Sequence, residues 1–291
     1  MELVLLLLVQ GIANGAHYAL LGLAFGLIFA TTNIVHFAFG AVFTCSAYAM
    51  WAGASLLGLP LPAAGLLAIA VGGLIGAATY VLLYRPFERK SAPIFVVMIA
   101  SLGLGILLEN LIGILVGSDT KVLPNIDNPT YIMEVGGNMI FVSGLQIAQV
   151  VSLIVVSLLL YLLLRMTSYG KAILAMTDNA QMARIIGIDT VKVSILVFAI
   201  GSAIAAIPAA IILAKDGATT FMGFNAVFIA FVAVIVGGVG SLPGAVLGGL
   251  LVGLVESIGM YAIPTEWQST ISFVVLFLVL IFRPTGLFRG V

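Results

Sequence analysis

Two acidic residues, Glu109 and Glu256, lie within apolar segments of the sequence. A carboxylate at mid-bilayer costs roughly 2.5–3.5 kcal/mol on insertion scales, so each acid needs a specific reason to be there. Each acid shares one helix face with small residues spaced about four apart. For Glu109 these are Ser101, Gly105, Gly113 and Gly117, and for Glu256 they are Ala245, Gly249 and Gly253. Small residues at this spacing let helices approach closely, so both acids are predicted to point into a helix bundle. Each acid either contacts a substrate or proton or joins helices by hydrogen bonds, and we favour the second role.

Further polar and aromatic residues interrupt the apolar segments. Together with the two acids, the candidate residues of a substrate pathway are Asn14, His17, Asn33, His36, Phe39, Glu109 and Glu256. The two histidines are nineteen residues apart and form no metal-binding motif. For His17 alone we favour a packed, hydrogen-bonded structural role. The glycine-rich segment 237–244 matches neither a phosphate-binding loop nor a dinucleotide fingerprint, and no catalytic cluster is present, so the sequence predicts no enzyme.

The composition requires a membrane protein. Of 291 residues, 63% are hydrophobic and 8% are charged, and the mean hydropathy is +1.29. These values exclude a water-soluble enzyme. The net charge is zero, which suggests no nucleic-acid partner, and the single cysteine, Cys45, excludes an intrachain disulfide. No polar stretch is long enough for a second core, so residues 1–291 are predicted to form one transmembrane domain.

The elements that must position these residues are membrane-spanning helices. The apolar runs are 3–30, 40–58, 61–84, 94–117, 139–164, 193–214, 224–261 and 267–282. The run 224–261 is too long for one crossing and is interrupted by the segment 237–244. The prediction is an all-α, polytopic helical bundle with about nine crossings and broken or re-entrant segments near 31–40 and 237–244. Because Gly-Ala-Val follows both breaks, at 40–42 and 244–246, we expect two pseudo-repeated halves.

Basic residues indicate the orientation of the chain. If the crossings alternate, nine of the eleven basic residues fall on one side of the membrane, namely Arg85, Arg89, Lys90, Arg165, Lys171, Arg184, Lys192, Arg283 and Arg289. The other side receives two basic residues together with the acids Asp119, Asp127, Asp216 and Glu266 among others. Short cytoplasmic loops accumulate Lys and Arg. The N-terminus is therefore predicted to lie outside and the C-terminus in the cytoplasm.

The cytoplasmic loop 165–192 is unusually polar for this chain. Residues 170–186 read as an amphipathic helix. The predicted buried face comprises Ile173, Met176, Ala180, Ala183 and Ile186–Gly187, and the predicted polar face comprises Lys171, Asp178 and Arg184. Such a helix either docks a soluble partner or rests on lipid headgroups, and periodicity alone leaves both open.

Several stretches taken together resemble the permeases of branched-chain amino acid ABC importers. They are Asn14-Gly15 with Tyr18-Ala19-Leu20, Asn33 to Gly40, Tyr84-Arg85-Pro86, Gly170 to Ile188, Gly237 to Gly244, and Arg283-Pro284-Thr285-Gly286. The resemblance covers nearly the whole chain. It implies a non-catalytic pore subunit in a bacterial inner membrane, with no cofactor bound directly, that works with a second related permease, two cytoplasmic ATPase subunits that use ATP, and an extracytoplasmic substrate-binding protein.

The resemblance also implies site residues. In the family, the helix that matches Ala183 to Gly187 couples the permease to the ATPase, so the predicted coupling residues are Gly170, Lys171, Asp178, Ala183, Arg184 and Gly187. The first break departs from the family, which usually reads Asn-Phe-Ala-His-Gly where this chain has His36-Phe37-Ala38-Phe39-Gly40. The substrate is therefore expected to be a branched-chain amino acid or another small polar solute, such as urea, an amide or a small acid. The alternative function is a stand-alone ion-coupled carrier or channel in which Glu109 and Glu256 relay protons.

Overall fold

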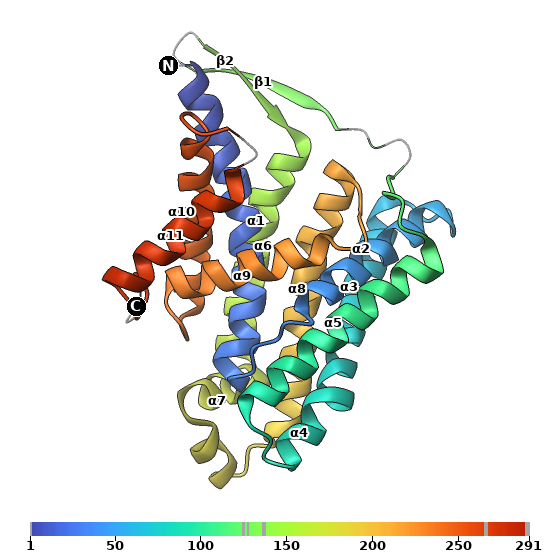
Figure 1. The fold of residues 1–291 in the computed structure, drawn as a ribbon, viewed down its shortest axis with the longest axis vertical. Helices are drawn as coiled ribbons and strands as arrows, with labels where there is room; N and C mark the ends of the chain where they lie inside the picture. The colour runs from blue at the N-terminus through green and yellow to red at the C-terminus, as the bar shows by residue number, and fades with distance from the viewer. Residues whose placement is uncertain (1, 124–125, 127, 136–137, 265–266, 289–291) are drawn as a thin grey trace. The chain divides into compact units, whose positions relative to one another are not determined.

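The computed structural model describes residues 2–123, 126, 128–135, 138–264 and 267–288. Of the residues used to predict the orientation, Asp127, Glu266 and Arg289 lie outside this part of the chain. Figure 1 shows a chain of helices with one antiparallel hairpin. The elements are α1 (Glu2–Thr32), α2 (Phe39–Ser55), α3 (Leu61–Thr79), the π-turn η1 (Tyr80–Tyr84), α4 (Arg85–Arg89), α5 (Ile94–Val116), β1 (Thr130–Val135), β2 (Asn138–Ser143), α6 (Gly144–Met166), α7 (Ser168–Ile185), α8 (Thr190–Asp216), α9 (Met222–Gly237), α10 (Leu242–Gly259) and α11 (Gln268–Phe282).

Six of the described helical segments are long and apolar enough to cross a membrane. They are Leu3–Thr32, Leu61–Arg89, Ile94–Val116, Gly144–Met166, Thr190–Asp216 and Leu242–Gly259. The apolar helices α9 and α11 are shorter, with 16 and 15 residues, and α2 has 17. The chain is therefore a helical, multi-pass membrane protein. The count of nine crossings stays a prediction that depends on these three shorter helices.

The spanning helix predicted from the apolar run 139–164 is wrong at its beginning. Residues 138–143 form strand β2 instead, and helix α6 starts at Gly144. The strand pairs with β1 in antiparallel register, with Ile132 opposite Phe141 and Thr130 opposite Ser143. β-branched and aromatic residues favour a pleated strand when a partner strand is available. Hydropathy did not predict this hairpin, because an apolar strand and an apolar helix have the same hydropathy.

The first predicted break lies between α1 and α2, at residues 33–38. The hydroxyls of Thr31 and Thr32 donate to the carbonyls of Leu27 and Ile28, at 2.8 and 2.7 Å. Asn33 then adopts a left-handed conformation with φ of 55°, which asparagine tolerates better than most residues. The polar sequence Thr-Thr-Asn thus ends the helix inside an otherwise apolar segment.

The second predicted break lies between α9 and α10, at residues 238–241. Gly238 and Gly240 have φ of 112° and 91°, which only glycine adopts readily. Ser241 then caps α10, because its hydroxyl accepts a hydrogen bond from the Gly244 N–H at 3.0 Å. A second helix therefore starts directly after the glycine-rich turn.

The C-terminal segment returns to this second break. The N–H groups of Leu287 and Phe288 donate to the carbonyls of Val236 and Gly237 at the end of α9, at 2.9 and 3.1 Å. Gly286 has φ of 84° and packs directly on the backbone of Gly238. The last carbonyls of a helix have no partner within the helix, so the segment satisfies groups that would be costly to leave unpaired in a membrane.

The described chain divides into two compact units, each assembled from segments that are far apart in the sequence. Unit 1 comprises residues 1–23, 125–156 and 228–291, and unit 2 comprises residues 24–124 and 157–227. Because the units interleave along the chain, neither is a continuous stretch that could be separated at a linker. The prediction of a single domain over 1–291 stays a prediction.

Within unit 1, close backbone contact joins the first 23 residues to α10. A Cβ atom added to Gly253 would meet the backbone of Gly15, and one added to Gly249 would meet the backbone of Ala19. Beside this contact, the side chains of Tyr18, Val232, Val236, Val252, Leu276 and Val279 form a buried cluster. The small-residue stripe of α10 therefore packs against α1, as its spacing predicts.

Within unit 2, helices α2, α3 and α8 pack against one another. A Cβ atom added to Gly72 would lie 3.1 Å from the Ser202 carbonyl, and one added to Gly76 would meet Phe198 and Ser202. At the start of α2, Gly40 and Gly223 touch backbone to backbone. Glycine in helices of membrane proteins permits this approach because no side chain separates the two backbones.

Candidate functional site

The candidate pathway residues fall into two groups. Asn14, His17 and Glu256 belong to unit 1, and Asn33, His36, Phe39 and Glu109 belong to unit 2. Each group is described separately below.

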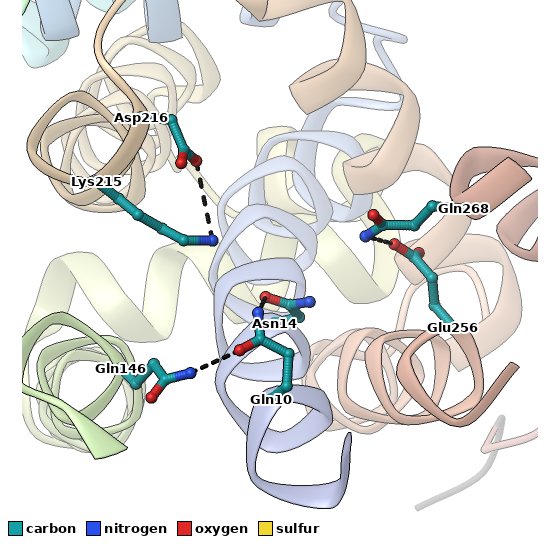
Figure 2. A network of polar contacts seen from close by, with 7 residues as sticks. All are labelled: Gln10, Asn14, Gln146, Lys215, Asp216, Glu256 and Gln268. Atoms are coloured by element: carbon teal, nitrogen blue, oxygen red, sulfur yellow. Dashed lines mark hydrogen bonds and ion pairs between the residues drawn. The ribbon is translucent and has the colours of Figure 1, made fainter. Parts of the chain in front are cut away.

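Glu256 of α10 is buried, with 2% of its surface exposed, and it accepts three hydrogen bonds. The donors are the Tyr18 hydroxyl at 2.7 Å, the Gln268 side-chain amide and the Ser272 hydroxyl. Figure 2 shows the contact between Glu256 and Gln268. The carboxylate thus joins α1, α10 and α11, which is the geometry expected of an acid that ties helices together.

Asn14 and His17 lie on α1. The Asn14 side-chain oxygen accepts a hydrogen bond from Gln10 at 3.3 Å, and Gln10 in turn accepts one from Gln146 of α6 at 2.6 Å (Figure 2). His17 is buried, and its ring lies edge-on to that of Tyr18, with 6.0 Å between the centroids. Both residues are therefore part of the packed interior of unit 1.

His36 lies in the first break and is fully buried. Its Nδ1 atom is 2.7 Å from the Tyr84 hydroxyl, which is 2.6 Å from the Ser101 hydroxyl. The Ala38 N–H donates to the same Ser101 oxygen at 3.0 Å. This chain of polar groups fixes the break to the π-turn η1 and to α5. π-turns within helices often mark functional or strained positions, and here η1 comes just before Pro86.

The remaining unit 2 candidates differ in exposure. Phe39 is fully buried, and its ring lies edge-on to that of His36, with 6.2 Å between the centroids. Asn33 is exposed and ends α1. Glu109 is half-buried on α5, which packs against α2. The structure therefore brings His36 and Phe39 together and places Asn33 at the surface.

The predicted amphipathic helix corresponds to α7, which is kinked at Asn179. Within α7, Asn179 has φ of −161° and ψ of 99°, and its side chain accepts a hydrogen bond from the Met182 N–H at 2.9 Å, which caps the second half. Gly170 is buried because α7 packs there on the backbone of Leu163 and Leu164. The continuous helix predicted over 170–186 is wrong at Asn179, since an asparagine can exchange helical hydrogen bonds for a cap of its own.

Two of the predicted coupling residues have structural roles within the chain. Ala183 is 2% exposed, so its small side chain packs inside the subunit. Gly187 has φ of 91° and follows the end of α7. Its N–H donates to the Arg184 carbonyl and the Ile188 N–H donates to the Ala183 carbonyl, both of which are features of a glycine-terminated helix. Ala183 therefore offers no exposed surface to a partner and Gly187 ends the helix, so the coupling role of these two residues stays a prediction.

The exposed residues of α7 are mostly polar, but apolar residues at its end are exposed as well. Lys171, Asp178 and Arg184 are exposed, as predicted for the polar face. Met182, Ile185 and Ile186 are also exposed, by 54%, 72% and 67%, so the prediction that Ile186 lies on the buried face is wrong. After the end of α7, Asp189 caps α8, and its pKa is lowered because its carboxylate accepts a hydrogen bond from the Lys192 N–H.

Sequence reasoning missed the partners of the buried polar residues. Tyr18, Gln268 and Ser272 surround Glu256, and Tyr84 and Ser101 adjoin His36. One signal was available, because Gln268 and Ser272 are spaced four apart at the start of an apolar helix and so share one face. No local pattern links Tyr18 to Glu256, which are 238 residues apart.

The geometry around Glu256 predicts how its variants behave. In Glu256→Gln, the amide oxygen can still accept from Tyr18 and Gln268, and the amide can donate to the Ser272 hydroxyl. Glu256→Leu leaves three donors without an acceptor, of which Tyr18 and Ser272 are buried, at roughly 1–3 kcal/mol for each buried donor. We expect the glutamine variant to keep most of its thermal stability and transport, and the leucine variant to unfold at a clearly lower temperature. Equal melting temperatures for both purified variants would contradict the role of Glu256 as an acceptor.

Comparison with known proteins identifies the family. Residues 7–280 match the family model described as branched-chain amino acid transport system / permease component. The chain is 31% identical over 290 residues to the high-affinity branched-chain amino acid transport system permease protein LivH of Salmonella typhimurium, covering 96% of this chain and 93% of that protein. It is 30% identical to BraD of Pseudomonas aeruginosa, a permease protein of the same description, covering 96% of this chain and 94% of that protein.

Two more distant similarities extend this result. The xylose transport system permease protein XylH of Haemophilus influenzae is 33% identical over 127 residues, which is 41% of this chain and 34% of that protein. A chain of PsaBC from Streptococcus pneumoniae, solved in complex with Fab, has a similar fold with a TM-score of 0.54 at 12% identity, covering 97% of this chain and 92% of that one. On the match over residues 7–280 and the identity along nearly its whole length, this chain belongs to the family of permease components of branched-chain amino acid transport systems.

Proposed function

We propose that this chain forms part of the translocation pathway of an ATP-driven importer for branched-chain amino acids or a related small polar solute. The observation that carries the proposal is the similarity to LivH and BraD over 96% of the chain. The proposed partners are a second related permease subunit, two cytoplasmic ATPase subunits and an extracytoplasmic substrate-binding protein. This subunit binds no nucleotide or other cofactor itself, and ATP is hydrolysed by its partners.

Reconstitution of the complete importer tests this function. Vesicles that contain both permeases and the ATPases, supplied with ATP and the binding protein, should accumulate leucine, isoleucine or valine. Vesicles that contain only this subunit should not, because no step in it would use ATP. Uptake by this subunit alone, driven by an ion gradient, would instead establish the stand-alone carrier.

The proposed setting is a bacterial inner membrane, crossed about nine times, with the N-terminus outside and the C-terminus in the cytoplasm. The excess of basic residues on one side supports this orientation, since cytoplasmic loops retain Lys and Arg. The two breaks support a pair of pseudo-repeated halves, because each is followed by Gly-Ala-Val and by close glycine packing, at Gly40 and at Gly244.

The orientation can be measured with single cysteines in a chain that carries Cys45→Ala. Lys171 and Asp119 are both exposed and lie in loops assigned to opposite sides. In intact cells, Asp119→Cys should react with a membrane-impermeant maleimide and Lys171→Cys should not. After the cells are opened, both should react. Reaction of Lys171→Cys in intact cells would reverse the orientation.

The loop 165–192 is proposed to couple this subunit to an ATPase through the exposed end of α7. Met182, Ile185 and Ile186 present apolar side chains there, whereas Ala183 is buried. Burying one isoleucine against a partner contributes about 1.5–3 kcal/mol, which exceeds the roughly 0.2–1 kcal/mol of an exposed charge pair involving Lys171, Asp178 or Arg184. Apolar contact should therefore dominate the docking.

A charge at this apolar end should separate the ATPase from the permease. We expect Ile185→Glu to lower co-purification of the ATPase by about tenfold or more, the equivalent of about 1.4 kcal/mol or more. Arg184→Ala should have a milder effect, and Gln181→Glu serves as the control because Gln181 is also exposed on α7. Full ATPase recovery and full stimulation of hydrolysis by substrate in Ile185→Glu would mean that α7 rests only on lipid.

A further inference from the structure

The hairpin of β1 and β2 in unit 1 has one exposed apolar face. Ile132 pairs with Phe141, and Glu134 pairs with Met139. These four residues lie on the same side of the hairpin, because paired residues share a face and so do alternate residues along a strand. They form the hairpin face, in which Ile132, Met139 and Phe141 are exposed by 62%, 58% and 51%. On the opposite face, Ile140 is buried, with 3% of its surface exposed.

The hydrocarbon of the membrane does not account for this exposure. Among the described residues, β1 and β2 form a sheet of only two strands, so the outer edge of each strand carries backbone N–H and C=O groups without a strand partner. Open sheet edges do not occur in the hydrocarbon region, because nothing there can bond those groups. The exposed apolar side chains of the spanning helices can face lipid, whereas those of the hairpin face lie outside the hydrocarbon.

The composition of the segment also argues against a hairpin that rests on lipid headgroups. Segments that lie on a membrane surface usually combine apolar residues with Lys and Arg, which attract anionic headgroups. Between Lys121 and Arg165 the sequence contains no basic residue, and its two acids are Asp127 and Glu134. Glu134 is exposed on the hairpin face. An apolar surface with an acidic border instead fits a protein whose own apolar patch is bordered by basic side chains.

The base of the hairpin is fixed to two helices. The Ser143 N–H donates to the Gln146 side-chain oxygen of α6 at 2.9 Å, and the Ser143 hydroxyl donates to the Asn128 side-chain oxygen at 2.7 Å. The Gln146 amide in turn donates to the Gln10 side chain of α1 at 2.6 Å (Figure 2). This anchoring holds the hairpin face in one orientation, which reduces the conformational entropy lost when a partner binds.

We propose that the hairpin face is the docking surface for the extracytoplasmic substrate-binding protein. The hairpin lies in the loop between α5 and α6, which the distribution of basic residues assigns to the outer side together with Asp119. The proposal rests on the proposed function for the partner and for the orientation. The binding protein contributes an apolar patch that covers Ile132, Met139 and Phe141, and a basic side chain that pairs with Glu134.

Binding is measured between the complete importer in nanodiscs and the fluorescently labelled, leucine-loaded binding protein. We expect Ile132→Asp to raise the dissociation constant at least about tenfold, because docking would strip water from a carboxylate within the apolar patch. Tyr131→Asp is the matched control, since Tyr131 is adjacent on β1, is 51% exposed and belongs to the opposite face. The control should bind within about twofold of the wild type, as is usual for a surface substitution outside an interface.

The charge of Glu134 is tested separately from the apolar contact. Glu134→Gln keeps the size of the side chain and removes its charge, so it should raise the dissociation constant by about twofold to fivefold, as expected for one exposed ion pair. Added salt should weaken the binding of the wild type more than that of Glu134→Gln. Equal salt dependence would mean that no basic side chain faces Glu134, and it would contradict the charge complementarity.

A fluorescent label shows what covers the hairpin face before the binding protein is added. Thr130 is exposed and lies on the same face as Ile132, so Thr130→Cys, as the only reactive cysteine of the importer in a Cys45→Ala chain, carries a bimane without altering the apolar residues. Iodide in the buffer should quench the label, and the binding protein should reduce that quenching. Quenching by doxyl-labelled lipids would show that the face rests on lipid, and protection from both quenchers would show that another permease subunit covers it. Either result would overturn the docking surface.

Failure of this docking surface and failure of the proposed function give different results. If the wild-type importer binds the binding protein, but Ile132→Asp and Tyr131→Asp keep or lose affinity equally, the docking surface is wrong and the proposed partner stands. If the folded wild-type importer does not bind the binding protein, the proposed partner is wrong, and so is the docking surface. If Ile132→Asp lowers the melting temperature of the importer, the bimane measurement decides, because it keeps Ile132, Met139 and Phe141 in place.

Discussion

Direct contact between helix backbones at glycine is the constraint on which both units depend. In unit 1, Gly15 meets Gly253, and in unit 2, Gly40 meets Gly223. Within a membrane, apolar side chains gain little by leaving lipid for a neighbouring helix, so close packing of small residues must hold the helices together. The polar groups described above are positioned by these contacts. Tyr18, for example, can reach Glu256 because Gly249 and Gly253 bring α10 against α1.

Buried polar groups in this protein are of two kinds, which are distinguished by whether the chain satisfies them. Glu256 receives three donors, and the hydroxyls of Tyr84 and Ser101 link His36 to α5. Such satisfied networks stabilise and orient helices. The hydroxyls of Tyr48, Ser202 and Thr220 are of the second kind, since they are buried and have no hydrogen-bond partner among the described residues. The two acids also differ, although their sequence contexts are alike, because Glu256 is buried among three donors and Glu109 is half-buried.

The motifs that identify the family occur together for structural reasons that the fold makes visible. The glycine-rich turn after α9 leaves helix carbonyls open, and the segment that follows Arg283-Pro284-Thr285-Gly286 returns to bind them. Likewise, Asn14-Gly15 adjoins the small-residue stripe of α10, and Tyr84 contacts the residues of the first break. Motifs that are far apart in the sequence thus contact one another in the fold.

The sequence alone determined that the chain is a helical membrane protein, where its two breaks fall and which faces carry small residues, because hydropathy, glycine and helix-ending residues act locally. It also led to the family, through motifs spread over the chain. Only the tertiary structure decided that residues 138–143 form a strand, that Asn179 kinks α7, and that Ala183 is buried while Ile185 is exposed. It alone decided that Glu256 is surrounded by donors while Glu109 is half-buried. The partners of Glu256 depend on a contact between residues 238 positions apart, which no local pattern encodes. The strand and the kink arise from neighbouring residues, but hydropathy does not distinguish an apolar strand from an apolar helix, and periodicity does not show where an asparagine caps a helix anew.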